Sequence, residues 1–235
     1  MLPLPPRQEK AVAFCRWTSY DCREVNAMLF DNHDERIPYY ELILERKNLD
    51  DICAPQLPTG FRFVFYKPGD RDAWINIEIS AKELKNHQQG VEVWEKYYGG
   101  KDDELIHRMV FVENELEEKV ATATAFYDVT GRDNSGAGWL HWVAVRRDYQ
   151  GMKLSKPLIG YVLNLMKSLG YEHGKIPTQT TTWLACKIYL DFGFRPVPKN
   201  AENSRAGWNI VKTLTNHPAL DAFEIIDVLA QKGQG

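Results

Sequence analysis

The spacing of apolar residues changes several times along this chain, and each change marks the boundary of an element. Residues 40–46 alternate apolar and charged positions, and residues 61–66 form a second short apolar run. Two further runs, 109–112 and 120–127, flank a charged turn. Alternation and short apolar runs between polar residues predict strands, the last two as a hairpin. The run 139–145 is rich in apolar and aromatic residues and predicts another strand.

Apolar residues at helical spacing predict the helices. Asp70 is a candidate cap for a helix through Trp74 and Ile77, and a second helix spans about 82–98 before two glycines stop it. A further helix follows the turn at 150–155, where the apolar residues form one stripe: Leu154, Leu158, Tyr161, Val162, Leu165 and Leu169.

The C-terminal part of the chain predicts smaller elements. Strands near 195–197 and at 208–212 would close the sheet as a second hairpin. Residues 219–230 look like an amphipathic helix. No internal repeat is visible in the sequence.

We divide the chain into three parts on this basis. Residues 1–58 form an N-terminal arm with a Pro-rich, partly disordered start, able to lend the sheet an edge strand but without chemistry of its own. Residues 59–215 form the main domain. Residues 216–235 form a C-terminal helix and tail.

Composition limits the class of protein. The 235 residues are 44% hydrophobic and 26% charged, an ordinary globular balance. No apolar stretch approaches the ~20 residues that cross a bilayer, and the prolines near the N-terminus do not suit a signal peptide. Cys15, Cys22, Cys53 and Cys186 show neither a CxxC pair nor metal-ligand spacing, so we expect no metal and reduced thiols in a cytoplasmic protein.

Charge is unevenly distributed. Residues 143–212 carry a net charge of +7, so the rest of the chain carries −10, because the total is −3. A basic half beside an acidic half suits an anionic ligand on one side and a cationic one on the other, although chance segregation of solvated charges would look the same. The pI near 6.1 and the absence of a recognition motif argue against nucleic-acid binding.

The turn after the strand 139–145 is the first candidate binding site. Residues 150–155 lead directly into an amphipathic helix, and Pro157 lies in its first turn, where a missing N–H costs nothing. The turn therefore presents a helix N-terminus, with free N–H groups and the positive end of the dipole, to a phosphate group.

The order of elements over residues 138–194 resembles the GNAT superfamily of acetyl-CoA-dependent N-acetyltransferases. The strand, the phosphate turn and its helix are followed by a second strand at 175–180 and by the spacing Tyr189 to Gly193-Phe194. The resemblance covers about residues 61–212. It implies an α/β fold, with a mixed sheet of six to seven strands, splayed central strands and helices on both faces. The implied activity is direct transfer of an acetyl group from acetyl-CoA to a primary amine.

The resemblance also implies which residues bind the cofactor. The main chain of Val143 and Val145 would bond the pantetheine arm, with Thr182 at a position where the family often has Asn. The phosphate turn would be residues Gln150, Gly151, Met152, Lys153, Leu154, Ser155 and Lys156. Lys153 and Ser155 occupy positions where the family has glycine, and they offer a cation and a hydroxyl donor in exchange.

The family's general acid corresponds to Tyr189, whose alternative interpretation is a core aromatic residue. In the arylalkylamine N-acetyltransferases a histidine occupies the place of His141, which lies four residues before Val145 and, at period two, would face the same way. His141 is therefore the candidate base, with a structural histidine as the alternative. Glu78, Glu113 or ordered water are other routes for the proton.

The acceptor pocket of the superfamily would correspond to residues 69–80, 82–98 and 197–207. These offer an aromatic and acidic wall for a cationic amine, although the same residues could be ordinary core and surface: Trp74, Trp94, Tyr97, Tyr98, Glu78, Glu83, Glu92 and Glu95. We expect a small-molecule amine as acceptor. A protein lysine or N-terminus, or a CoA-binding module without turnover, are the alternatives. The oligomeric state stays open, a homodimer included.

Overall fold

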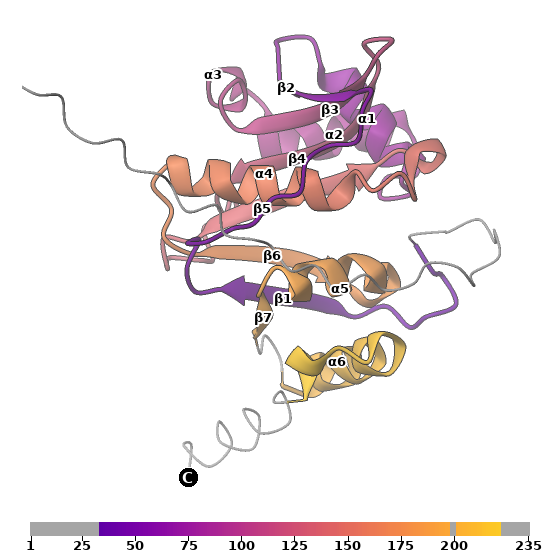
Figure 1. The fold of residues 1–235 in the computed structure, drawn as a ribbon, viewed down its shortest axis with the longest axis vertical. Helices are drawn as coiled ribbons and strands as arrows, with labels where there is room; N and C mark the ends of the chain where they lie inside the picture. Colours follow the sequence, from indigo (N-terminus) through magenta and orange to yellow (C-terminus); the bar gives the residue numbers. More distant parts are fainter. Residues whose placement is uncertain (1–32, 198–200, 222–235) are drawn as a thin grey trace, which may run out of the picture.

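The computed structural model describes residues 33–197 and 201–221, which form one open sheet with helices on both faces (Figure 1). Seven strands follow the order β2-β3-β4-β5-β6-β1-β7. Neighbouring strands are antiparallel except β5 and β6, which are parallel, so the predicted mixed α/β sheet is confirmed. The strands are β1 (Glu41–Arg46), β2 (Phe61–Phe65), β3 (Met109–Asn114), β4 (Lys119–Phe126), β5 (Gly138–Val145), β6 (Gly174–Gln179) and β7 (Arg195–Val197).

The helices divide between the two faces of the sheet. In Figure 1, α4 and α5 lie on one face and α1 and α2 on the other. Short 3-10 turns cover Arg147–Tyr149, Thr180–Thr182 and Pro218–Leu220. The helices are α1 (Arg71–Ser80), α2 (His87–Tyr98), α3 (Asp102–Leu105), α4 (Ser155–Ser168), α5 (Trp183–Asp191) and α6 (Ala201–Thr215).

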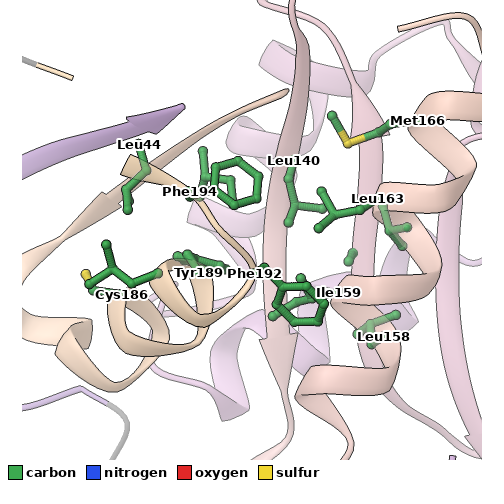
Figure 2. Packing of buried hydrophobic residues seen from close by; sticks show 14 of the residues in the cluster. Leu44, Leu140, Leu158, Ile159, Leu163, Met166, Cys186, Tyr189, Phe192 and Phe194 are labelled. Carbon is green, nitrogen blue, oxygen red and sulfur yellow. The ribbon is translucent and has the colours of Figure 1, made fainter. Parts of the chain in front are cut away.

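Each face of the sheet has its own core because strand residues alternate in direction. On β4, three alanines (121, 123 and 125) face the core under α4 and α5, whereas Phe126 belongs to the core under α1 and α2. Small alanines leave room for the large residues of α4, and Figure 2 shows Leu158, Ile159 and Leu163 packed there. Thr122 and Thr124 are fully buried between the alanines, so the α1 and α2 side of β4 is polar.

A bulge in β5 and the short pairing between β5 and β6 shape the centre of the sheet. His141 pairs with Thr124 and Ala144 pairs with Thr122, so two residues of β5 face one of β4. Trp142, in the bulge, has a φ of 50°. β5 and β6 are registered only at Gly138–Gly174 and Trp139–Lys175, and beyond these pairs the strands diverge. The predicted splay of the central strands is therefore present.

Several predicted elements need correction. The strand at 40–46 is not at an edge, because β1 lies between β6 and β7. Residues 208–212 belong to helix α6 and not to a closing hairpin, since Trp208 and Val211 are three apart and both pack on the core beside α5. The second helix begins at His87 and not near 82, because Lys82 has a φ of 65° that interrupts a helix. Most of the helix expected at 219–230, and the start of the N-terminal arm, lie outside the described residues.

The described part of the N-terminal arm is an integral part of the fold. After β1 it crosses over α4 (Figure 1), where Ala54 packs against Gly160 and the amide of Asn164 donates to the carbonyl of Ile52 at 3.3 Å. The expectation of four reduced thiols is wrong at Cys53, which is disulfide-bonded, whereas Cys186 is a free, buried thiol. Sequence spacing cannot show which cysteines the fold brings together. None of the helices over 33–197 and 201–221 is long and apolar enough to cross a membrane.

Candidate active site

The turn between β5 and α4 presents backbone N–H groups to solvent. In the part of the chain that the structure describes, the N–H groups of Gly151, Lys153, Leu154 and Ser155 donate no hydrogen bond. Leu154, at the N-cap of α4, offers no side-chain acceptor either. Free N–H groups at the positive end of a 14-residue helix form a site for an anion such as phosphate.

Two residues of this turn adopt a left-handed backbone, and only one of them is glycine. Gly151 has a φ of 80° and Lys153 a φ of 62°. A non-glycine residue in this region costs about 1 kcal/mol or slightly more, so Lys153 keeps the turn's shape at an energetic cost. Its side chain is exposed, so the lysine does not fill the turn.

The side chains of the turn divide their contacts between the protein and solvent. The amide nitrogen of Gln150 donates to the carbonyl of Val145 at 3.0 Å, which fastens the turn to the end of β5. Lys156 pairs with the carboxylate of Asp191 at 3.0 Å, so its charge is partly neutralised. Met152 is 45% exposed. Lys153 is therefore the turn's exposed cation.

The edge of β5 beyond Trp139 faces the gap left by β6. Val143 and Val145 lie along this edge, and the Val145 carbonyl is occupied by Gln150. On the opposite side of the gap, the Thr182 hydroxyl donates to the carbonyl of Gln179 at 3.1 Å. Val143 thus lies beyond the last registered pair of β5 and β6, whereas the Val145 carbonyl and the Thr182 hydroxyl have hydrogen-bond partners within the protein.

Tyr189 lies in the larger core, on α5 with Cys186 (Figure 2). The residue is 5% exposed. Burial raises the pKa of Tyr189 far above its ordinary value, and the neighbouring Cys186, Glu83 and Glu78 raise it further. The hydroxyl therefore keeps its proton at neutral pH, as a general acid must.

His141 lies on the other side of the sheet from the predicted position. Because of the bulge at Trp142, Val145 faces the core under α4 while His141 packs against Tyr97 of α2 and Phe126, with ring centroids 5.7 and 5.8 Å away. Period two fails here because the bulge adds one residue. Burial lowers the pKa of His141 to about 4, and its Nδ1 atom has no partner.

Glu78 of α1 is fully buried, and neither of its carboxyl oxygens has a hydrogen-bond partner. Burial raises its pKa well above the ordinary value, and the charge of Glu83 raises it further. Glu83 accepts a hydrogen bond from the Gln179 amide at 3.2 Å, and its pKa is raised by burial. The charges of both glutamates raise the pKa of Tyr189. The charge of Asp128 raises the pKa of His141, against the larger effect of burial.

The predicted acceptor wall separates into buried and exposed members. Trp74, Trp94 and Tyr98 pack against one another, with ring centroids 5.2 to 5.8 Å apart, and belong to the core. Glu92 and Glu95 are exposed on α2. Of the predicted acidic residues, Glu78 and Glu83 alone line the interior. The alternative base Glu113 lies on β3, two strands from β5, and forms an ion pair with Arg62 at 2.7 Å.

Residues 33–40 pack against the turn that follows β6, a contact that the sequence did not predict. The N–H of Tyr40 donates to the Thr180 hydroxyl at 2.9 Å, and the N–H of Asp34 donates to the Thr181 carbonyl at 2.8 Å. His33 lowers the pKa of Glu83, and the charge of Glu83 raises the pKa of Tyr39. The segment therefore covers the end of β6 beside Glu83.

Comparisons with known proteins identify the class of the protein as an acetyltransferase. Residues 71–194, more than half of the chain, match the model of the acetyltransferase (GNAT) family. A GCN5-related N-acetyltransferase from Sphaerobacter thermophilus is similar in structure, with a TM-score of 0.54 at 16% identity over 68% of this chain and 49% of that chain. A Drosophila protein of known structure gives 0.50 at 12% identity, over 68% of this chain and 48% of that chain.

The chain belongs to the GNAT acetyltransferase family. It spans about half the length of these two solved structures. A search of curated protein sequences finds no significant match. The structural similarities, all at low identity, concern the fold alone.

Proposed function

We propose that the protein transfers an acetyl group from acetyl-CoA directly to a primary amine, and that the acceptor is a small molecule. The observation that carries the proposal is a pair of features along β5: the free N–H groups of the phosphate turn after its end, and the gap between β5 and β6, with α5, which carries Tyr189, packed on β6. The family gives the reaction class, and these two features support the proposed position of the cofactor.

The residues present fit acetyl-CoA. The turn offers unpaired N–H groups and the exposed cation of Lys153 to the pyrophosphate. The open edge of β5 at Val143 offers main-chain groups to the pantetheine, as an added strand would use them. When bound, acetyl-CoA supplies an activated acetyl group as a thioester.

The side chains of the protein perform the proton transfers. An amine near its ordinary pKa of about 10 arrives as an ammonium ion and must lose a proton before it attacks. Tyr189 holds a proton beside the gap and would donate it to the departing thiolate. We assign the base to Glu78 in preference to His141, because the charge of Glu78 raises the pKa of Tyr189, whereas burial lowers the pKa of His141 to about 4 and makes it a weak base.

Enclosure favours a small acceptor over a protein. Glu78 is fully buried, and residues 33–40 cover the end of β6 beside Glu83. An open groove for a polypeptide would leave these carboxylates exposed. The cytoplasmic location stays a prediction, and the disulfide at Cys53 argues against it, because thiols in the cytoplasm are kept reduced.

Calorimetric titration with acetyl-CoA tests the proposal, followed by a thiol-release assay with primary amines. We expect micromolar binding, and much weaker binding of acetylpantetheine, which lacks the pyrophosphate and nucleotide. Equal binding of the two compounds would refute the role of the turn. No binding of acetyl-CoA would refute the proposed function as a whole.

A further inference from the structure

The sheet consists of two parts, and β5 and β6 pair at one end of the boundary between them. The two strands are registered at Gly138–Gly174 and Trp139–Lys175 and diverge after these pairs. Helix α4 packs on β3, β4 and β5, whereas α5 packs on β6 (Figure 1). A side-chain bond between α4 and α5 therefore links the two parts of the sheet across the boundary.

Asp191, the last residue of α5, makes such a bond to Lys156 in the first turn of α4. The Lys156 ammonium donates to Oδ2 of Asp191 at 3.0 Å, and the Lys187 ammonium lies 3.6 Å from the same oxygen. His217, which follows α6, has its Nε2 atom 3.3 Å from Oδ1. Because the Nδ1 atom of His217 accepts from the N–H of Ala219 at 3.1 Å, Nε2 is the atom that donates to the carboxylate.

These partners keep the Asp191 carboxylate ionised. Burial by itself would raise the pKa of Asp191, but the hydrogen bond and charge of Lys156, the charge of Lys187 and the hydrogen bond from His217 lower this pKa overall. The side chains of Asp191 and Lys156 are 20% and 36% exposed, so the pair is neither sealed in the core nor fully solvated. An anion that arrives from solvent can therefore compete for Lys156.

Lys156 is also part of the phosphate turn. It directly follows Ser155, one of the residues whose N–H groups donate no hydrogen bond in the described structure. Lys153 and Lys156 are the two cations of residues 150–156. An anion at the turn and the carboxylate of Asp191 are therefore two alternative partners for one ammonium group.

We propose that Asp191 is an autoinhibitory counter-ion of the cofactor site: in the free protein it pairs with Lys156, and it must yield this lysine when the pyrophosphate of acetyl-CoA binds at the turn. The inference rests on the proposed function and adds a residue that limits cofactor affinity. Two effects oppose binding while the carboxylate is present, namely the loss of its pair with Lys156 and its repulsion of the phosphates. Asp191 acts through Lys156 and is therefore a positioning residue.

The other partners of Asp191 allow Lys156 to be exchanged. A partly buried carboxylate that loses a sole counter-ion is left uncompensated, which is strongly destabilising. Asp191 instead retains the Lys187 ammonium and the His217 donor, one from its own helix and one from the segment after α6. Release of Lys156 therefore costs little on the protein side, and the outcome depends on the anion that binds.

A second ion pair crosses the same boundary, at the end where β5 and β6 are paired. Lys175 of β6 lies 2.9 Å from Asp133, in the loop before β5, and also donates to the Ser135 hydroxyl at 3.1 Å. The Lys175 and Asp133 side chains are only 16% and 12% exposed, and they lie at the end of β5 opposite to the phosphate turn. This pair serves as a structural tie, whereas the pair of Lys156 and Asp191 is more exposed and adjoins the turn.

The first test is calorimetric titration of the whole chain with acetyl-CoA at low ionic strength. Asp191→Asn removes the charge and keeps an oxygen that accepts from His217, so acetyl-CoA should bind about threefold to tenfold more tightly than to the wild type. Asp50→Asn is the matched control, because it removes another ion pair to α4, with Lys167, and should leave the affinity unchanged. Added salt should reduce the gain of Asp191→Asn, since screening weakens both opposing effects.

A double-mutant cycle separates an effect through Lys156 from a general effect of charge. Lys156→Gln should weaken acetyl-CoA binding, because the pyrophosphate loses a cation. In that background, Asp191→Asn should lose most of its gain in affinity. Acetylpantetheine, which lacks the pyrophosphate, should bind equally to the wild type and to Asp191→Asn. A merely structural Asp191 would give the opposite sign, because its loss would lower the affinity for acetyl-CoA.

Urea unfolding checks that the variants are folded, and Asp191→Ser is the second variant if Asp191→Asn is not. Four results would overturn the inference while leaving the proposed function intact: acetyl-CoA affinity unchanged or lowered in the Asp191 variant, an equal gain with and without Lys156, an equal gain for acetylpantetheine, or unchanged affinity in Lys156→Gln. Binding of acetyl-CoA by the Asp191 variant alone would support the inference. No binding by any of these proteins would instead refute the proposed function, and the inference with it.

Discussion

His141→Gln should change the pH dependence of stability in a way that reports directly on the buried imidazole. Folding lowers the pKa of His141 from 6.5 to about 4, because the ring is buried among Tyr97, Phe126 and Trp139. As the pH falls below 6.5, the unfolded chain binds a proton that the folded protein does not bind. Stability is therefore complete above pH 6.5 and is lost progressively as the pH falls to about 4.

The magnitude follows from the size of this pKa difference. Each pKa unit corresponds to about 1.4 kcal/mol, so lowering the pH from 7.5 to 5 should cost the wild-type protein about 2 kcal/mol through this residue alone. Glutamine does not titrate, so the variant should lose that much less stability over the same interval. Other groups titrate in both proteins, and the difference between the two isolates His141.

Urea unfolding at a series of pH values measures the effect, with extrapolation to zero denaturant at each pH. His107→Gln is the matched control, because the His107 side chain is exposed and makes no ion pair among the described residues, so the variant should have a pH profile parallel to that of the wild type. Parallel profiles for wild type and His141→Gln would refute the burial argument. They would also restore His141 as a base that titrates in the neutral range.

Three further predictions follow from the site and the core. Tyr189→Phe should lower kcat by about 10²-fold or more with little change in acetyl-CoA affinity, since it removes a proton donor and keeps the ring; equal losses in both would exclude the acid role. Gly151→Val should weaken acetyl-CoA binding, because a β-branched residue resists the φ of 80°, whereas Gly131→Val, at a φ of 66° in another loop, should not; calorimetry compares the two. Gly160→Ala should destabilise the fold by about 1–3 kcal/mol in urea unfolding, because its Cβ would lie 2.7 Å from that of Ala54; unchanged stability would show that the segment can shift.

The sequence alone determined the parts of the site that are local. The apolar run at 139–145, the turn with Gly151 and the stripe of α4 depend on residues close together in the chain, where periodicity and turn chemistry act. The spacing from Tyr189 to Gly193 is local for the same reason. Family membership and the mixed sheet followed from the order of these parts, and both are confirmed.

Tertiary structure decided everything that depends on distant contacts. The bulge at Trp142 arises from pairing with β4, and it moved His141 to the face opposite Val145. The place of β1 inside the sheet depends on pairing with β6, more than 130 residues later in the chain. Burial of Glu78 depends on the packing of α1 against α2, β4 and β5, and no local pattern distinguishes it from the exposed Glu92. The raised pKa of Glu78 follows from that burial, so it became visible only in the folded molecule.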